Sequence, residues 1–223
     1  LCLTCQIKLS PFTLGECKQF FESKDIAMSS YDLVEAYMIV GGIPYYLNYF
    51  KRGKSLAQNI DLLFFCKNAK LEDEFTRLFS SLFINPNDYM EIVKLLARRH
   101  TGFTRDEIAE KLNLNPGGSF SKMLEILTAS DFITSYHPFN RSQKEIRYKL
   151  IDHFCLFYLR FIDGKDITDD SFWLHNQNMP QLNSWRGLSF EQVCFNHVSK
   201  IKKALGVEGV SSRESPWIVK GDD

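Results

Sequence analysis

Two glycines and a proline interrupt the apolar stretch VGGIPYYL at positions 40–47. A paired glycine followed by proline weakens a helix and removes one backbone donor, so the pattern indicates a special backbone path. Such a path serves either the packing of two helices or the close approach of a ligand, and the residues alone leave both interpretations open. Gly42 and Pro44 are therefore candidate binding residues.

Residue types that bind metal occur without the spacing that a metal site needs. Cys2 and Cys5 form a CLTC pair, but no second pair of ligands lies nearby, and a structural zinc ion takes four ligands. His153 and His197 lie in apolar helical segments, where histidine is more often a core residue than a ligand. No metal site is expected.

The composition is that of a folded globular protein without a strong overall charge. The chain has 223 residues, of which 44% are hydrophobic, and its 27 basic residues balance 27 acidic ones. A net charge of zero provides no global attraction to nucleic acid or anionic lipid, so any basic surface must be local. The sequence has no run of eighteen apolar residues and no signal-peptide pattern, which predicts a cytoplasmic protein that does not bind a membrane.

The first 85 residues have the patterns of a helical unit. Thr13 stands three residues before Glu16, which predicts a capping box at the start of a helix. Apolar residues at helical spacing predict a second helix from about Ser30 to Gly41 and further helices between 55 and 83. The opening QIKLSPF, at 6–12, predicts a short strand.

The pattern changes after Asn85-Pro86-Asn87, where three short helices precede two strands. The helices are predicted at 88–100, 104–114 and 119–130, and the strands FITSYH and IRYKLI surround a polar tip. Thr104 and Glu107 predict a second capping box. Three helices and a hairpin within about 65 residues are typical of a winged helix-turn-helix.

In a winged helix the third helix enters the major groove and the hairpin tip contacts phosphate. Residues 87–150 contain ten Lys and Arg against eight Asp and Glu, whereas specific DNA binders usually carry a denser basic patch. Contact with double-stranded DNA and pure domain packing therefore remain alternatives. The candidate DNA-binding residues are Ser119, Ser121, Lys122, Arg141, Lys144 and Arg147.

Beyond residue 150 the sequence predicts two helices, at 152–162 and 188–205, separated by a polar connection at 164–180. Two strand candidates follow, VEGVSS at 207–212 and PWIVK at 216–220. The expected fold is mainly α with a small β component.

Five stretches together resemble the C-terminal part of the archaeal-type AAA+ ATPases, relatives of the STAND group. They are LSPFTLGE (9–16), YMIVGGIPYYL (37–47), LEDEFTRLFSSLF (71–83), YKLIDHFCLFYLRFI (148–162) and GLSFEQVC (187–194). The resemblance implies a helical lid at 1–85, a winged helix at 86–150, and a linker helix with a truncated α/β restriction-endonuclease-like domain at 151–223. The N-terminal ATPase core is then missing, and no GxxxxGK[ST] phosphate-binding motif occurs in the chain.

The resemblance also implies roles for three residues. Gly42 and Pro44 match a glycine-x-proline lid element that contacts the adenine side of a nucleotide. Glu191 matches the first glutamate of a nuclease motif whose aspartate and Glu-x-Lys would lie beyond Asp223; the local alternative is a solvent-facing glutamate at a helix start.

At the level of the whole protein, the resemblance implies that the full-length protein is an ATPase that uses ATP and Mg, whereas this chain holds no cofactor and is inactive. Its oligomeric state is open. The alternative function is a winged-helix transcriptional regulator that acts without a nucleotide.

Overall fold

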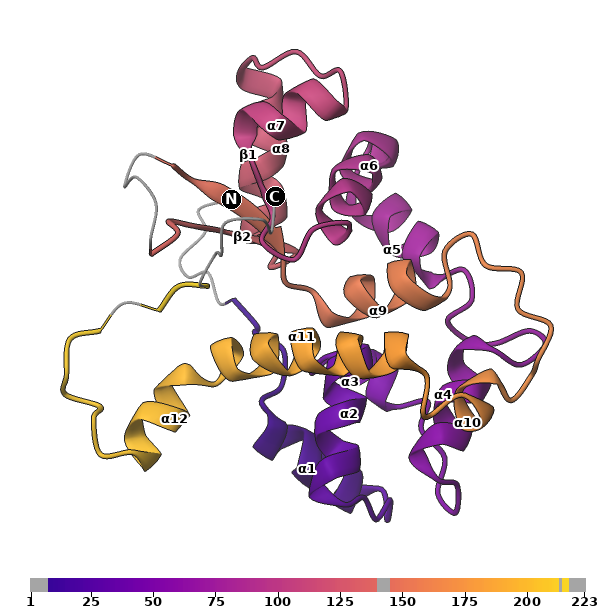
Figure 1. Cartoon of the computed structure of the whole chain (residues 1–223). Coiled ribbons are helices and arrows are strands. Elements are labelled where there is room, and N and C mark those ends of the chain that lie inside the picture. Colours follow the sequence, from indigo (N-terminus) through magenta and orange to yellow (C-terminus); the bar gives the residue numbers. More distant parts are fainter. Residues whose placement is uncertain (1–7, 140–144, 213, 217–223) are drawn as a thin grey trace, which may run out of the picture.

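Helices make up most of the chain, and a single small sheet lies among them (Figure 1). The computed structural model describes residues 8–139, 145–212 and 214–216. This part of the chain forms twelve helices and a three-stranded antiparallel sheet, which confirms the mainly helical class. None of the helices that these residues form combines the length and apolarity needed to cross a membrane.

The first unit consists of five helices: α1 (Leu14–Ser23), α2 (Ser30–Val40), α3 (Pro44–Leu47), α4 (Leu56–Phe64) and α5 (Glu74–Leu82). The capping box predicted at α1 is confirmed, because the Glu16 amide donates to the Thr13 hydroxyl and the Thr13 amide donates to the Glu16 carboxylate. The predicted opening strand is wrong over its described residues, 8–12. Pro11 has no amide donor, and the Phe12 amide donates to the Gly42 carbonyl instead of to a neighbouring strand.

Residues 86–150 contain the three predicted helices and the predicted hairpin in the expected order. These elements are α6 (Pro86–Ala97), β1 (Phe103–Thr104), α7 (Arg105–Lys111), α8 (Gly118–Ala129), β2 (Ile133–Tyr136) and β3 (Arg147–Leu150). The strand order is β1-β3-β2, with Ile133 opposite Leu150 and Phe103 opposite Tyr148. The Thr104–Glu107 capping box is confirmed, whereas the two-residue strand β1 was not predicted.

The C-terminal region is helical throughout its regular elements, which are α9 (His153–Phe161), α10 (Phe172–His175), α11 (Pro180–Asn196) and α12 (Val198–Ala204). The predicted strand at 207–212 is wrong, because Gly206 (φ 70°) ends α12 and the Val207 amide turns back to the Lys202 carbonyl. The second strand candidate lies outside the described residues except for Pro216, which is not in a strand. The described residues after 150 therefore contain no strand, and the expected α/β character of this segment is not found there.

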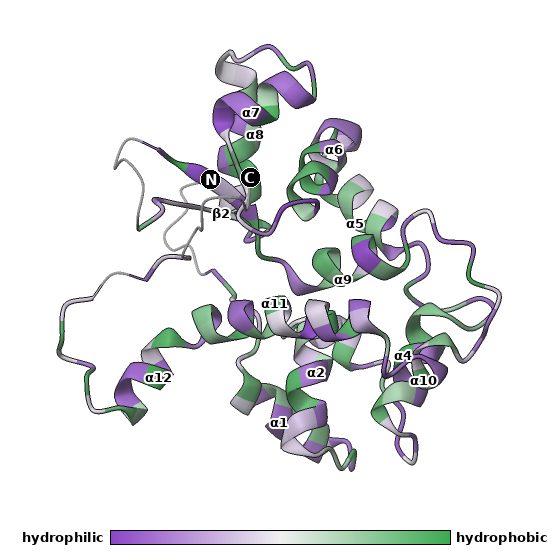
Figure 2. Cartoon of the chain, in the orientation of Figure 1, coloured by the Kyte–Doolittle hydropathy of each residue, from purple (hydrophilic) through white to green (hydrophobic). Residues whose placement is uncertain are grey.

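One continuous hydrophobic core crosses the predicted unit boundaries. The cluster of buried side chains extends from Cys17 to Val193, and the apolar positions on α2, α4 and α9 are visible in Figure 2. Helix α9 lies at its centre, with Phe154 stacked on Tyr46 at 4.9 Å and Phe157 packed on Phe64 at 4.9 Å between ring centroids. The helices before residue 85 and after residue 150 are therefore held to one another by aromatic contacts.

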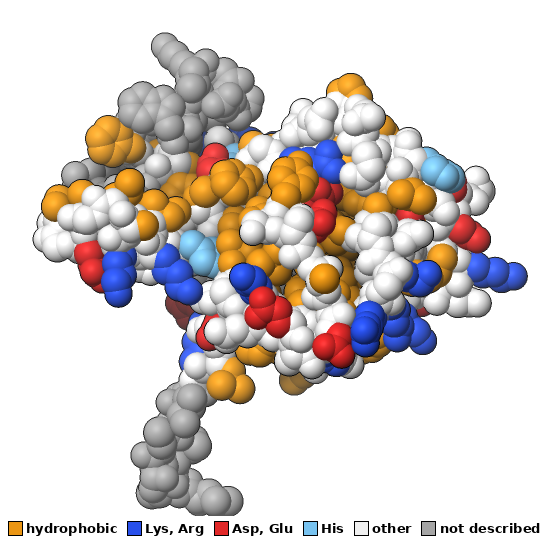
Figure 3. Space-filling model, turned by 90° about the horizontal axis from the view of Figure 1, so that it is seen from below, with side chains coloured by type: hydrophobic (Ala, Val, Ile, Leu, Met, Phe, Trp, Pro, Cys, Tyr) orange, Lys and Arg blue, Asp and Glu red, His pale blue; other side chains and the backbone are white. Residues whose placement is uncertain are grey.

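The last helix is attached more loosely. Helix α12 has no buried residue, and Ile201 on this helix and Leu205 just after it are exposed. Figure 3 shows apolar side chains at the left of the molecule, where α12 lies. Elsewhere on that face, basic side chains alternate with acidic ones (Figure 3), as expected for a chain without net charge.

Candidate functional site

The turn at Gly41–Pro44 lies against the backbone of the segment before α1. A Cβ atom on Gly42 would lie 1.9 Å from the Phe12 carbonyl oxygen, and the Phe12 amide donates to the Gly42 carbonyl at 2.7 Å. Gly41 has a φ of 64°, and Pro44 is the first residue of α3. Contacts within the chain therefore account for the interrupted helix pattern of VGGIP.

The same turn also borders a cavity of about 400 Å³, which Tyr37, His153 and Asn196 line from other elements. His153 is buried, and its Nε2 lies 3.2 Å from the Asn196 amide nitrogen. His197 accepts a hydrogen bond from the Leu14 amide at 3.1 Å. Both histidines are core residues, as the sequence predicted, and nucleotide contact by Gly42 and Pro44 stays a prediction.

The predicted recognition helix α8 projects from the body of the molecule together with α7 (Figure 1). Ser119 and Lys122 on α8 are exposed. Ser121 is less accessible, because its hydroxyl accepts a hydrogen bond from Arg105 at 3.1 Å. Two of the three predicted side chains on this helix are therefore free to meet a partner.

Arg147 occupies a different place from the one predicted. Its side chain is buried, with 5% of the residue exposed, and its guanidinium donates to Glu145 at 2.7 Å and to the Gly102 carbonyl at 3.3 Å. The expectation that Arg147 presents a phosphate donor on the surface is wrong, because this position of β3 faces inward. Arg141 and Lys144 lie outside the described residues.

Glu191 joins three elements. Its Oε1 atom lies 3.2 Å from His100 Nε2, in the loop after α6, and 3.7 Å from Lys149 Nζ on β3. The hydrogen bond with His100 lowers the pKa of Glu191, and the positive charge of Lys149 adds to this effect. The expected position at a helix start is wrong, because α11 begins at Pro180 and Glu191 lies in its second half, where its side chain is partly exposed.

Glu191 also lacks the neighbours that a metal-dependent nuclease requires. Such enzymes hold divalent ions with several carboxylates. Within residues 8–139, 145–212 and 214–216, no group of three or more His, Cys, Asp or Glu side chains is placed to hold a metal ion. In this structure Glu191 therefore acts as a link between α11 and the sheet, and a catalytic role for it remains a prediction.

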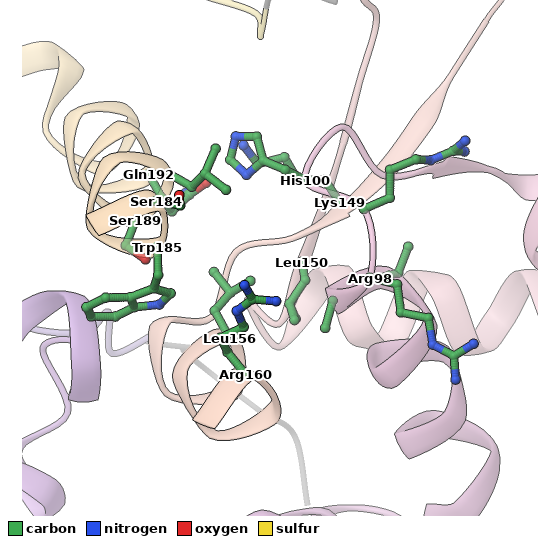
Figure 4. A pocket seen from close by; sticks show the side chains of 14 residues that line it. Arg98, His100, Lys149, Leu150, Leu156, Arg160, Ser184, Trp185, Ser189 and Gln192 are labelled. Carbon is green, nitrogen blue, oxygen red and sulfur yellow. The ribbon is translucent and has the colours of Figure 1, made fainter. Parts of the chain in front are cut away.

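A cavity of about 190 Å³ lies next to this link, between the α6–β1 loop, β3, α9 and α11 (Figure 4). We call it the junction cavity. Lys149, Ser189 and Gln192 line it and are almost completely buried, and burial lowers the pKa of Lys149. The Lys149–Glu191 distance of 3.7 Å is too long for a hydrogen bond.

Sequence reasoning did not find the junction cavity. The available signal was a lysine inside the apolar strand IRYKLI, together with Trp185, Ser189 and Gln192 at helical spacing on the later helix. These residues are far apart in the sequence, and only the packing of α11 against β3 brings them together.

Comparison with known proteins gives little further information. No protein-family profile and no solved structure matches the chain. A curated relative, the uncharacterized protein MJECL04 of Methanocaldococcus jannaschii, is 26% identical over 225 residues, which cover 97% of this chain and 48% of the relative. The chain thus spans about half the length of that relative, whose name states no activity.

Proposed function

We propose that this chain is the C-terminal half of an archaeal-type AAA+ ATPase in which residues 86–150 form a winged helix that couples nucleotide state to the C-terminal helices. The element order α6-β1-α7-α8-β2-β3 and the β1-β3-β2 sheet support the winged helix. In this proposal α1–α5 belong to the lid, Gly42 and Pro44 face the nucleotide, and ATP and Mg bind in a preceding ATPase core. A nuclease-like domain would begin within residues 151–223, and the rest of its motif would lie beyond Asp223.

The continuous core is the observation that carries the coupling role. Phe79 of α5 packs on Phe132, next to β2, at 5.0 Å between ring centroids, and Phe83 stacks on Tyr89 of α6 at 4.0 Å. Aromatic contacts of this kind, one buried and one half-buried, resist separation of the two segments. A displacement of α1–α5 would therefore carry residues 86–150 with it.

The second contact of the winged helix is with α11. The ion pairs of Glu191 with His100 and Lys149 connect α11 to the loop after α6 and to β3. Residues 86–150 are thus held on one side by the helical unit and on the other side by α11. This arrangement suits an element that transmits a movement between its neighbours.

The charge on the projecting helices favours coupling over DNA binding. The exposed charged residues of α7 and α8 comprise three acidic and two basic side chains: Asp106, Glu110, Glu125, Lys111 and Lys122. A surface of this kind lacks the density of cations that supplies most of the affinity for DNA.

Contact with double-stranded DNA is the second candidate function. The exposed position of Ser119 and Lys122 on a helix that projects from the body favours it. Arg141 and Lys144, at the hairpin tip, would add phosphate contacts under this proposal.

A titration of a fluorescent DNA duplex with the chain separates the two candidates. Coupling alone predicts no change in fluorescence anisotropy at micromolar protein, even at about 50 mM salt. Binding that weakens strongly at about 200 mM salt, is reduced in Lys122→Ala and is kept in the control Lys18→Ala would favour DNA contact instead. Lys18 is an exposed lysine of α1, remote in sequence from α8.

The ATPase proposal is tested on the whole encoded protein. The reading frame should contain a GxxxxGK[ST] motif before Leu1, and ATP should change hydrogen exchange in α6 and β3 as well as in α1–α5. A reading frame without this motif would remove the ATPase assignment. Exchange that changes only in α1–α5 would contradict coupling while leaving nucleotide binding intact.

A further inference from the structure

The junction cavity contains buried polar atoms that have no partner. Lys149 Nζ, Trp185 Nε1 and Gln192 Oε1 are all inaccessible and make no hydrogen bond to the described residues, and all three residues line this cavity. Buried polar atoms in native proteins are nearly always hydrogen-bonded. Two donors and one acceptor on residues that line this cavity therefore favour a polar occupant.

Basic side chains outnumber acidic ones around the cavity. Glu191 is shared between His100 and Lys149. Arg160, from α9, has no ion-pair partner among the residues that the structure describes, and Figure 4 shows its guanidinium directed toward the cavity. One carboxylate thus pairs with a histidine and a buried lysine, and Arg160 adds an exposed, unpaired guanidinium to the lining, which favours an anionic occupant.

Part of the lining of the cavity is apolar. It is formed by Leu96, Leu150, Leu156, Leu188 and the ring of Trp185. The volume of about 190 Å³ is somewhat larger than an apolar cavity of roughly 150 Å³ that accommodates benzene. The space therefore suits an anionic group joined to a small carbon skeleton, rather than a whole dinucleotide or a bare monatomic ion.

We propose that the junction cavity binds a small phosphate monoester. Lys149 and Arg160 supply the positive charge for the phosphoryl oxygens, and the Trp185 indole N–H supplies a further donor. Gln192 Oε1 accepts a hydrogen bond from a hydroxyl group of the ligand, and the leucine wall contacts its carbon atoms. A phosphoryl group accepts more hydrogen bonds than a carboxylate does, which suits several donors around one cavity. The proposal does not depend on the ATPase assignment.

Binding at this place would strengthen the contact between α11 and the sheet. Lys149 belongs to β3, Arg160 to α9, and Trp185 and Gln192 to α11, so a single ligand bridges three elements. A ligand that binds only the folded chain also raises its stability by mass action. Binding of the ligand should therefore raise the thermal stability of the folded chain.

Isothermal titration calorimetry with phenyl phosphate tests the proposal. This probe combines a phosphoryl group with an apolar ring of about the right size. We expect a dissociation constant below about 1 mM, weaker binding of inorganic phosphate and of benzoate, and no binding of phenol. Phenyl phosphate should also raise the melting temperature.

Three variants locate the binding. Lys149→Met keeps the length of the side chain but removes its charge, and it should weaken the binding of phenyl phosphate at least tenfold. Arg160→Met should weaken this binding several-fold. Lys18→Met, a lysine-to-methionine change at an exposed residue of α1, should leave the affinity unchanged. Lys149→Met should remain folded, because Glu191 is partly exposed and keeps His100 as a partner at 3.2 Å, so that no buried charge is left unpaired.

The proposal is overturned by any of four results. These are no heat and no thermal shift at about 10 mM phenyl phosphate, equal affinity of Lys149→Met and the natural chain, tighter binding of inorganic phosphate than of the ester, and benzoate binding as tight as that of phenyl phosphate. The first result would mean that only water occupies the cavity, and the last would make it a general site for anions.

Discussion

The neighbouring backbone leaves no room for a side chain at Gly42. An added Cβ atom would lie 1.9 Å from the Phe12 carbonyl oxygen, so Gly42→Ala must displace the backbone and lose the bond between the Phe12 amide and the Gly42 carbonyl. We expect Gly42→Ala to lower the free energy of unfolding by about 3 kcal/mol, as measured by urea denaturation at pH 7.

Gly118 is the matched control for this change. It lies at the first position of α8, and a Cβ atom there meets nothing within 4 Å. Gly118→Ala should therefore change stability by less than about 1 kcal/mol, in the stabilising direction. Equal effects of the two substitutions would show that Phe12 does not constrain Gly42.

His153 should make stability depend on pH near neutrality. Burial lowers the pKa of His153 to about 3, and the neighbouring His197 adds to the effect. The unfolded chain, with an imidazole pKa of about 6.5, takes up the proton first. Stability is therefore complete above about pH 6.5 and falls as the pH decreases toward 3, with a slope that approaches about 1.4 kcal/mol per pH unit.

Urea midpoints at pH 7, 6 and 5 measure this slope. His153→Gln keeps an acceptor for the Asn196 amide but cannot titrate, so its stability should be flatter over this range. His175→Gln, at an exposed histidine that pairs with Asp169, should keep the slope of the natural chain. Parallel slopes for the natural chain and His153→Gln would contradict the prediction.

For single residues, the sequence predicted the burial of two histidines correctly and the surroundings of Arg147 incorrectly. It placed His153 and His197 in the core because they lie in apolar helices. It predicted Arg147 on the surface, next to the polar hairpin tip. The alternation of side chains along a strand shows which residues share a face, but it does not show which face the rest of the chain buries. Arg147 and Lys149 share the buried face, and Lys149 is covered in part by α11, about forty residues later.

Helix α10 depends on a distant carboxylate. Asp61 of α4 accepts hydrogen bonds from the amides of Trp173 and Leu174 at 2.7 and 3.1 Å, and burial raises the pKa of Asp61. Asp61→Ala would leave the Trp173 amide buried without an acceptor. We expect a loss of about 2–3 kcal/mol in the free energy of unfolding, and a smaller loss for Asp61→Asn.

Hydrogen exchange provides a local measure of the same contact. The Trp173 amide should exchange much faster in Asp61→Ala than in the natural chain. Asp170→Ala removes an exposed carboxylate close to α10 and should leave this exchange rate unchanged. If both variants left it unchanged, Asp61 would not stabilise α10.

Elements that depend on nearby residues were predicted, and those that depend on distant ones were not. The capping boxes at α1 and α7 involve residues three positions apart, so the sequence shows them directly. The sequence predicted only a polar connection where α10 lies, because its carboxylate partner is 112 residues earlier. Residues 207–212 have the composition of a strand but pair with no strand among the described residues, and their backbone turns instead.

The arrangement of the whole molecule follows from one aromatic core. The sequence change at Asn85-Pro86-Asn87 suggested a boundary between units, yet Phe79 packs on Phe132 and Phe83 stacks on Tyr89 across it. A turn signal shows where the chain changes direction. It does not show whether the segments on either side share a core.

A shared core predicts that the segments before and after residue 85 unfold together. Phe132 is buried against Phe79 and Phe83, so Phe132→Ala should lower the free energy of unfolding by about 3–5 kcal/mol. The loss should appear in one transition in which the calorimetric and van't Hoff enthalpies agree. Ile84→Ala, at a fully exposed residue beside the same boundary, should change neither value. Two separate transitions, of which Phe132→Ala shifts only the one at higher temperature, would mean that residues 86–150 fold independently. The winged helix could then not transmit movement through a shared core.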